Sequence, residues 1–408
     1  MKKASIILAI MLAFGLAAGN CPASEDTGID IHGFISQGYL QSSDNNFHAP
    51  TADGTFEFNE FGINFSKDLT DKMRAGVQLF ARDLGTLGND EVTIDWAYGD
   101  YRWKDWLGFR AGKIKTPQGL YNETRDVDAL RNWVFLPQSV YAEVLRDTTL
   151  SLIGGGIYGN IDLNTAGFLS YQAAVGTQNI DGDPKLFNSL LGAAGNNNVV
   201  DVTIDVERKY SLGLLWETPL DGLRLGGTWN RTKMDMAGTV LDFQVGPFPP
   251  MDVLFSGDYK KFETTVFSVE YTWNDLLLVG EYMKSHREVT FYAVGGSMDL
   301  EYKPDGWYLG TAYRFNDWFE LGGYYSEYYA DRNDRDGEDA TPFYKGYLKD
   351  LSLTARFDID AYWTIKVEGH SYDGTATLSH VDNLVPTDGS DQWEEGWHMF
   401  AAKATFSF

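Results

Sequence analysis

Charged residues of opposite sign alternate along one polar segment of the chain, at Glu123, Arg125, Asp126, Asp128 and Arg131. If this segment lies in a narrow passage, carboxylates and guanidinium groups that face each other across it create an electric field that orients dipolar solutes. If it lies on the outside of the molecule, the same groups form solvated ion pairs that contribute little to stability. The elements that position the segment therefore decide what its charges do.

Residue spacings typical of enzymes are absent from the sequence. It contains no G-x-S-x-G nucleophile motif, no phosphate-binding loop with a lysine and no C-x-x-C-H haem motif. The histidines are scattered and match no metal-binding spacing; they are His32, His48, His286, His370, His380 and His398. We therefore expect no catalytic residue, no metal and no cofactor.

Composition excludes further classes of protein. The chain carries 58 acidic and 33 basic residues, a net charge of -25, whereas nucleic-acid phosphates are bound by clustered Lys and Arg. Aromatic residues make up 15% of the chain, which argues against disorder. A single Cys provides neither a disulfide framework nor a Cys-based metal site. We expect an ordered protein that does not bind nucleic acid.

The first residues indicate a secretory signal peptide. Two lysines precede an apolar run over residues 6–18, and small residues follow. We expect residues 1–23 to be the signal peptide and 24–408 to form one domain, and cleavage after Ala18 or Gly19 is the alternative. Cys21 suggests acylation, but Asn20 stands before it, where a lipoprotein needs a small residue. No later apolar run approaches the ~18 residues of a membrane helix, so the mature chain is periplasmic, secreted, or an outer-membrane β-barrel.

Apolar and polar residues alternate with a period of two along the chain, as in strands with one apolar and one polar face. Between Phe400 and Phe408 every second residue is Phe or Ala, whereas Lys403 and Thr405 share the other face. An antiparallel sheet with one wet face shows the same alternation. Its recurrence along the whole chain favours a lipid-facing exterior around a polar lumen. The charged residues expected on the lumen wall are Arg74, Arg82, Asp95, Arg110, Arg224, Glu270, Glu281, Arg314, Glu320, Arg356, Lys366 and Glu368.

Short and long connections alternate between these strands. The short turns lie at 68–72, 104–105, 159–162, 219–222, 274–275, 316–317 and 358–361, and aromatic residues such as Trp103 and Trp318 flank them. The long polar segments lie near 41–56, 84–91, 116–147, 177–208, 234–260, 288–306, 330–348 and 374–397. This asymmetry predicts an all-β fold, a transmembrane antiparallel β-barrel of about 16 strands with short periplasmic turns and long outer loops. One long segment, 244–255, is apolar, and we leave open whether it contacts a neighbouring subunit, covers the mouth, or is covered by other loops.

The signal peptide, the strand pattern and the final Phe400, Phe406 and Phe408 resemble Gram-negative outer-membrane porins. In that family a terminal aromatic strand is the signal for the barrel-assembly machinery. Residues 111–120 (AGKIKTPQGL) are similar to the fifth-strand exit of phosphate-selective-type porins. The basic lumen of those porins is missing, so phosphate selectivity does not carry over. The resemblance implies a homotrimer surrounded by outer-membrane lipid and lipopolysaccharide.

The resemblance also implies that the segment 116–147, which follows the fifth strand, folds into the pore and narrows it. We then expect passive diffusion of small hydrophilic solutes or ions across the outer membrane. Three alternatives remain. A barrel that sheathes a partner, for example an electron-transfer protein, needs a lumen free of this loop. A substrate-specific anion channel needs a ladder of like charges. An outer-membrane hydrolase needs a Ser/His pair.

Overall fold

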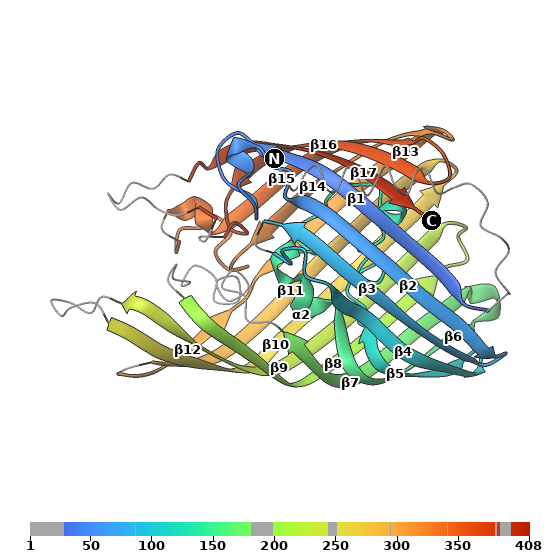
Figure 1. Cartoon of the computed structure of the whole chain (residues 1–408), viewed down its shortest axis with the longest axis horizontal. Helices are drawn as coiled ribbons and strands as arrows, with labels where there is room; N and C mark the ends of the chain where they lie inside the picture. Colours follow the sequence, from blue (N-terminus) through green and yellow to red (C-terminus); the bar gives the residue numbers. More distant parts are fainter. Residues whose placement is uncertain are drawn as a thin grey trace.

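The computed structural model describes residues 28–85, 87–180, 199–243, 251–293, 295–340, 342–379, 382–383 and 393–408. The predicted signal peptide, His380 and residues 244–250 lie outside the described residues. Antiparallel strands form one sheet that closes on itself, because β1 pairs both with β2 and with β17 (Figure 1). The structure therefore confirms the predicted β-barrel.

Seventeen strands make up the sheet within the described residues. They are β1 Asp30–Ser42, β2 Phe58–Thr70, β3 Met73–Leu84, β4 Thr93–Lys104, β5 Leu107–Lys115, β6 Ser151–Asp162, β7 Phe168–Ile180, β8 Val199–Glu217, β9 Leu223–Phe243, β10 Met251–Trp273, β11 Leu276–Ala293, β12 Gly296–Tyr302, β13 Asp305–Asn316, β14 Phe319–Tyr329, β15 Tyr347–Asp358, β16 Trp363–Gly374 and β17 Gly396–Ser407. Both β12 and β13 pair with β11, and only residues 303–304 separate them. Counted as one wall strand, they give the predicted barrel of 16 strands.

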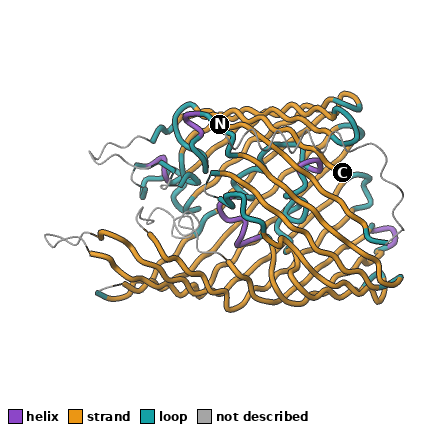
Figure 2. The backbone as a smooth tube through the Cα atoms, viewed as in Figure 1, coloured by secondary structure: helices purple, strands orange, loops and turns teal. Residues whose placement is uncertain are grey.

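Helical structure in the described residues is limited to short turns (Figure 2). They are Thr51–Asp53, Asp128–Leu130, Glu143–Leu145, α2 Arg146–Thr149, Asn164–Ala166 and Phe343–Lys345. No helix in this part of the chain is both long and apolar enough to span a membrane.

The two faces of the strands differ as the alternation predicted. In β17, Lys403 and Thr405 are buried inside the barrel, whereas Phe400 points outward and is 46% exposed. Leu309 and Leu353, from strands elsewhere in the wall, are also exposed on the outer face. An apolar exterior around a polar interior is the arrangement that a lipid environment requires of a barrel.

Strands β8 to β11 are much longer than the others, and the described residues of three predicted loops lie largely in strands instead. Segments 177–208, 234–260 and 288–306 contribute to strands of 18 to 23 residues, which extend beyond the rest of the barrel (Figure 1). In the first of these segments, Val202 and Ile204 are buried and alternate with acidic or polar residues. The apolar segment predicted as a loop also joins β10 at Met251. The sequence prediction missed these strands because many charged residues lie on their outer face, and such residues are typical of loops.

The two ends of the barrel wall are joined at the last residue. Phe408 N–H donates to Gly33 O (2.9 Å), and Gly33 N–H donates to Phe408 O (3.0 Å). The Phe408 ring lies so close to Gly33 that a Cβ there would be 2.5 Å from Phe408 Cζ. A glycine at position 33 therefore leaves the space that the terminal aromatic ring occupies beside the first strand.

Candidate pore constriction

The segment 116–150 joins β5 to β6 and crosses the interior of the barrel. Gly119 N–H donates to Thr228 Oγ1 of β9 (3.0 Å), and Val134 N–H donates to Glu368 Oε2 of β16 (2.8 Å). Side chains of widely separated wall strands can meet one loop only within the lumen. The structure therefore shows the segment folded inward.

The sequence itself sends the chain away from the wall at the end of β5. Pro117 lacks the N–H that a further ladder bond requires. Gly119 follows with φ +59°, in the left-handed region that favours glycine, and a Cβ there would collide with the Tyr141 hydroxyl. These residues turn the backbone inward within a few positions.

Asp128 lies at the centre of a buried group of cations. Its carboxylate is 3.2 Å from Lys366 Nζ, 3.4 Å from Lys403 Nζ and 3.2 Å from an Arg131 guanidinium nitrogen. Thr405 Oγ1 also donates to it (2.9 Å). Burial alone would raise the pKa of Asp128, but the three cations hold this pKa below its ordinary range. Asp128 thus fixes the loop to β16 and β17 as a charged group.

A second buried group of charges joins Asp126 and Arg146 of the loop to the wall strands β4 and β5. Asp126 accepts hydrogen bonds from Arg146 (2.6 Å) and from Lys115, and Arg146 also donates to Asp95 of β4 (2.9 Å). Burial would raise the pKa of Asp126, but Lys115 and Arg146 outweigh burial and lower it. The loop carries its own counter-ion, because Arg146 belongs to the same segment.

Glu143 forms a third ionic contact between loop and wall. It accepts hydrogen bonds from Arg82 of β3 (2.8 Å) and from Arg125 within the loop (2.8 Å). Although burial raises the pKa of Glu143, the two arginines lower it from 4.5 to about 2. This pair of contacts is almost completely shielded from solvent.

Wall carboxylates also receive the backbone of the loop. Glu368 accepts the N–H groups of Val134 and Phe135 (2.8 and 3.0 Å). His370 is oriented between Glu368 and Asp350, with one ring nitrogen 3.0 Å from each. The sequence predicted Glu368 as a wall charge, but neither His370 nor Asp350 as part of the site. In the sequence, the only signal for His370 and Asp350 was their position on the polar faces of their strands.

Glu281 has the equivalent role on the other side. It accepts hydrogen bonds from Leu120 N–H (2.9 Å), Ser268 Oγ (2.5 Å) and Tyr308 OH (2.8 Å), and from Tyr141 OH. Each oxygen therefore has two donors, which compensates the cost of removing a carboxylate from water. These bonds fix both ends of the loop to β11.

Apolar contacts complete the attachment of the loop. Trp133 and Tyr141 are almost fully buried, and they pack with Val266 and Met283 of the wall. The Trp133 ring meets the Tyr324 ring edge to face, with centroids 5.4 Å apart. Because aromatic residues bury large apolar areas, these contacts add to the ionic ones in holding the loop in one position.

Cavities lie on both sides of the loop. The loop-side cavity, about 320 Å³, is lined by Val140 and Phe262 among others, and the turn-side cavity, about 310 Å³, by Arg110, Glu123 and Arg224. They share no lining residue. The loop thus separates two spaces that lie along the lumen.

A seam of uncharged groups lies between the two cavities. We use "seam" for residues 117–119 of the loop together with Thr228 and Asn230 of β9. Asn230 Nδ2 donates to Pro117 O (2.7 Å), and Gly119 N–H donates to Thr228 Oγ1 (3.0 Å). Neutral hydrogen bonds hold this part of the loop, whereas ion pairs, hydrogen bonds to wall carboxylates and apolar contacts hold the remainder.

Several solved outer-membrane proteins have a shape similar to that of this chain. OmpT of Vibrio cholerae in its trimer form is 14% identical and matches over 93% of this chain and 99% of its own, with a TM-score of 0.53. The anion-selective porin from Comamonas acidovorans is 12% identical over 93% and 99%, with a TM-score of 0.53. OmpF of Salmonella typhi in complex with daunomycin is 11% identical over 94% and 99%, with a TM-score of 0.56. The chain has the porin fold. No protein-family model and no curated protein matches the sequence.

The porin fold places the predicted loop charges in different surroundings. Arg125, Asp126, Asp128 and Arg131 are each at most 4% exposed and lie in the ion pairs described above. Glu123 alone of the five is exposed, and it lines the turn-side cavity, where Gln172 donates to it. The geometry makes four of these residues anchors of the loop.

The predicted wall charges fall into two sets. One set binds the loop: Arg82, Asp95, Glu270, Glu281, Glu320, Arg356, Lys366 and Glu368. The other set lies towards the short turns and pairs along the wall, Arg110 with Asp100, Arg74 with Asp68, Arg314 with Asp358 and Arg224 with Glu270. Many wall charges therefore pair with a charge of opposite sign, whereas Arg356, Lys366 and Lys403 lie side by side on β15, β16 and β17.

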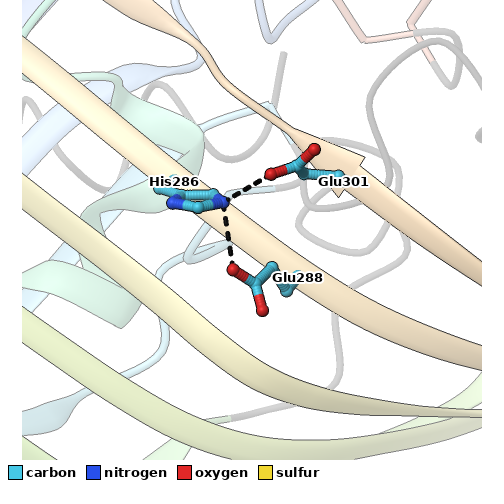
Figure 3. Close-up of side chains that lie close together, drawn as sticks. All are labelled: His286, Glu288 and Glu301. Carbon is cyan, nitrogen blue, oxygen red and sulfur yellow. Dashed lines mark hydrogen bonds and ion pairs between the residues drawn. The ribbon is translucent and has the colours of Figure 1, made fainter.

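One histidine lies among carboxylates on the outer face of the wall. His286 Nε2 is 2.8 Å from Glu301 and 3.1 Å from Glu288 (Figure 3). These ligand atoms are close enough to hold a metal ion. However, Lys261 Nζ is 2.9 Å from His286 Nδ1 and must donate to it, which places the ring proton on Nε2, facing the carboxylates. Lys303 pairs with Glu301 as well (2.7 Å). This is a hydrogen-bonded ionic cluster, and we assign no metal to it.

Proposed function

We propose that the chain is a channel for the passive diffusion of small hydrophilic solutes or ions across the outer membrane of a Gram-negative bacterium. The observation that carries this proposal is the segment 116–150, which lies inside a closed barrel and has a cavity on each side. Pore radius and the charges at the narrowest section determine what such a channel passes. Here the narrow section is the seam, with Glu123, Arg110 and Arg224 on its turn side.

The geometry disfavours the alternatives. A sheath for a partner protein needs an open lumen, but the loop is bonded to wall strands on opposite sides. A substrate-specific anion channel needs a ladder of like charges open to the lumen. Several basic wall residues pair with acidic ones instead, and the adjacent Arg356, Lys366 and Lys403 are bonded to the loop. A hydrolase needs a histidine nitrogen to activate a serine, whereas both ring nitrogens of His370 are bonded to carboxylates. We propose that the protein is not an enzyme.

We further propose a homotrimer that contacts lipid and lipopolysaccharide and is inserted by the barrel-assembly machinery. The trimer form of the similarly shaped OmpT supports the first point. The terminal aromatic residues support the last point, since Phe400 and Phe406 lie on the outer face of β17 and Phe408 follows it directly.

Planar-bilayer recording of the purified protein tests the channel. We expect discrete, steady conductance steps in KCl, and larger steps from a variant in which a Gly-Ser linker replaces residues 120–148. The shift of folded protein on an unheated gel shows in each case that the barrel is closed. A folded, inserted protein that gives no steps would overturn the channel proposal.

A further inference from the structure

Exposed basic side chains gather on the outer faces of β8, β9, β10 and β11, just beyond the apolar surface of the barrel. We use "basic patch" for these residues: Arg208, Arg231, Lys233, Lys260 and Lys284. We propose that the basic patch binds the phosphate groups of lipopolysaccharide in the outer leaflet. The inference rests on the proposed contact with lipopolysaccharide, which it deepens by naming the groups that make it, and it does not depend on conduction through the lumen.

The outward-facing residues of these strands change in character with distance from the apolar band. On β8, Leu214 and Leu212 are exposed and apolar, Arg208 follows, and Asp205 lies farther out. Two neighbouring strands repeat this order, with Trp229, Lys233 and Asp235 on β9 and Phe267, Lys260 and Asp258 on β10. The apolar band of a membrane barrel faces the acyl chains and ends where the headgroups begin. The basic patch therefore lies at the height of the headgroup phosphates.

Basic residues of the patch lie opposite one another on adjacent strands. Arg208 of β8 is paired in register with Lys233 of β9, and β10 has a bulge at Lys260 and Lys261 on the other side of Lys233. Like charges that lie directly opposite destabilise a sheet. Neighbouring strands are only ~4.8 Å apart. A phosphate that bridges two of these strands would contact both cations and remove their repulsion.

Arg231 and Lys284 are exposed, and neither forms an ion pair with a residue that the structure describes. Glu263 lies opposite Arg231 in register, yet the two side chains are not paired. Asp305 lies opposite Lys284. The Asp305 carboxylate already has two other partners, Tyr282 (3.0 Å) and Arg335 (2.5 Å). Both cations can therefore bind a phosphate without breaking an existing ion pair.

Two further members of the patch have only weak partners. Arg208 lies 3.3 Å from the hydroxyl of Tyr210, which carries no charge. Lys260 lies 3.9 Å from Asp299, and the Asp299 side chain is 83% exposed. Exposed contacts of this kind contribute little to stability. A phosphate offers charged oxygens to each cation, and charge-assisted hydrogen bonds are about twice as strong as neutral ones.

The carboxylates at this height are too few to neutralise the patch. On β8 to β10 they are Glu207, which pairs with Lys233, and Glu263. The ionic cluster around His286 lies beside the patch and is balanced, because two lysines pair there with two glutamates. An excess of positive charge next to an anionic lipid surface favours binding, by about fivefold for each basic residue.

The test is binding of diphosphoryl lipid A, the anchor of lipopolysaccharide, to the purified protein in detergent, measured by native mass spectrometry. Lipid A without phosphate and inorganic pyrophosphate are the comparison probes. We expect diphosphoryl lipid A to bind most tightly. An excess of pyrophosphate should not displace it, because pyrophosphate lacks the acyl chains that contact Leu212 and Phe267. Equal binding of the two forms of lipid A, or displacement by pyrophosphate, would overturn the proposal.

The double variant Arg208→Gln with Arg231→Gln should weaken the binding of diphosphoryl lipid A ~25-fold, since two contributions of about fivefold are lost. The double variant Arg208→Lys with Arg231→Lys keeps both charges and should keep most of the affinity. The matched control is Lys72→Gln with Lys104→Gln, which removes two exposed positive charges at the short-turn end of the barrel. Equal binding by the two glutamine double variants would refute the proposal.

Two further measurements separate this inference from its rivals. Opposed carboxylates of Asp205, Asp235 and Asp258 lie farther out on the same strands. Binding that requires Mg²⁺ and survives Arg208→Gln with Arg231→Gln would assign the headgroup to these carboxylates and overturn the basic patch. KCl conductance is recorded on the same samples. A protein that binds diphosphoryl lipid A but does not conduct would sink the channel proposal and support the patch, whereas a conducting protein that does not bind it would do the reverse.

Discussion

The substitution Asp128→Asn tests whether buried charges hold the constriction loop in place. It preserves the shape of the side chain but removes a negative charge that lies within 3.4 Å of Lys366, Lys403 and Arg131. Lys403 and Arg131 keep Glu60 of β2 as a second partner. Removing one partner of a buried ionic group costs ~3–5 kcal/mol, because a charge left behind, here that of Lys366, loses its compensation. At ~1.4 kcal/mol per factor of ten, the lower value already shifts the equilibrium between attached and detached loop by more than 100-fold.

Detachment would change the pore in a defined way. The displaced loop would widen the lumen, and it would uncover Arg356, Lys366 and Lys403, which are adjacent on three neighbouring strands. We therefore expect larger conductance steps, and a reversal potential in a KCl gradient that moves toward chloride. Asp336→Asn is the control, because it removes the same charge from an exposed position in an outer loop.

The reasoning would be refuted by an Asp128→Asn protein that keeps both the conductance and the reversal potential of the parent. That result would mean that the apolar contacts of Trp133 and the hydrogen bonds to Glu368 suffice to hold the loop. Increased conductance without a change in ion preference would show that the loop moves but that Arg356, Lys366 and Lys403 stay covered.

Three further predictions follow from other contacts. The lowered pKa of Glu143 contributes roughly 3 kcal/mol to loop attachment above pH ~4.5, and this contribution is lost as the pH falls toward 2. Proteolysis of the loop should therefore become faster as the pH is lowered through this range. Glu143→Gln should remove this pH dependence. Glu281→Gln should give brief openings in single-channel records, because the carboxylate that holds the loop beside the seam loses its charge; unchanged records would contradict this. Gly33→Ala should lower the free energy of unfolding in urea by ~1–3 kcal/mol, because its Cβ meets the Phe408 ring, whereas Gly99→Ala, with open space around it, should have little effect.

The barrel could be predicted from sequence because its signal is local. Alternation needs only residues two positions apart, and every strand repeats it. The same rule was available for the long hairpins, where Val202 and Ile204 alternate with Asp201 and Thr203. There the alternation was given less weight than the charges of the outer face. Such charges are typical of loops, but they also suit strands that extend beyond the lipid.

The position of the constriction loop could be predicted from the sequence, but the residues that it contacts could not. The position of the charged loop after the fifth strand could be inferred from the resemblance, and Lys366 and Glu368 lie on the polar face of their strand, buried inside the barrel. The partners could not be inferred, since Lys366 is 238 residues from Asp128 and the pairing depends on the three-dimensional closure of the barrel. The sequence alone therefore suggested freely exposed pore charges, whereas most of them hold the loop.

The same long separations have a consequence for the order of folding. Val134 and Glu368, which are bonded to each other, lie 234 residues apart, so their contact must await synthesis and pairing of β16. Contacts of such high sequence separation carry the largest loop-closure entropy and form late. We expect the strands to pair one after another into a closed barrel with an empty lumen. The constriction loop then docks inside it. A newly inserted molecule would then be briefly leaky and unselective, and the rate at which it stops leaking would measure the docking of a single loop.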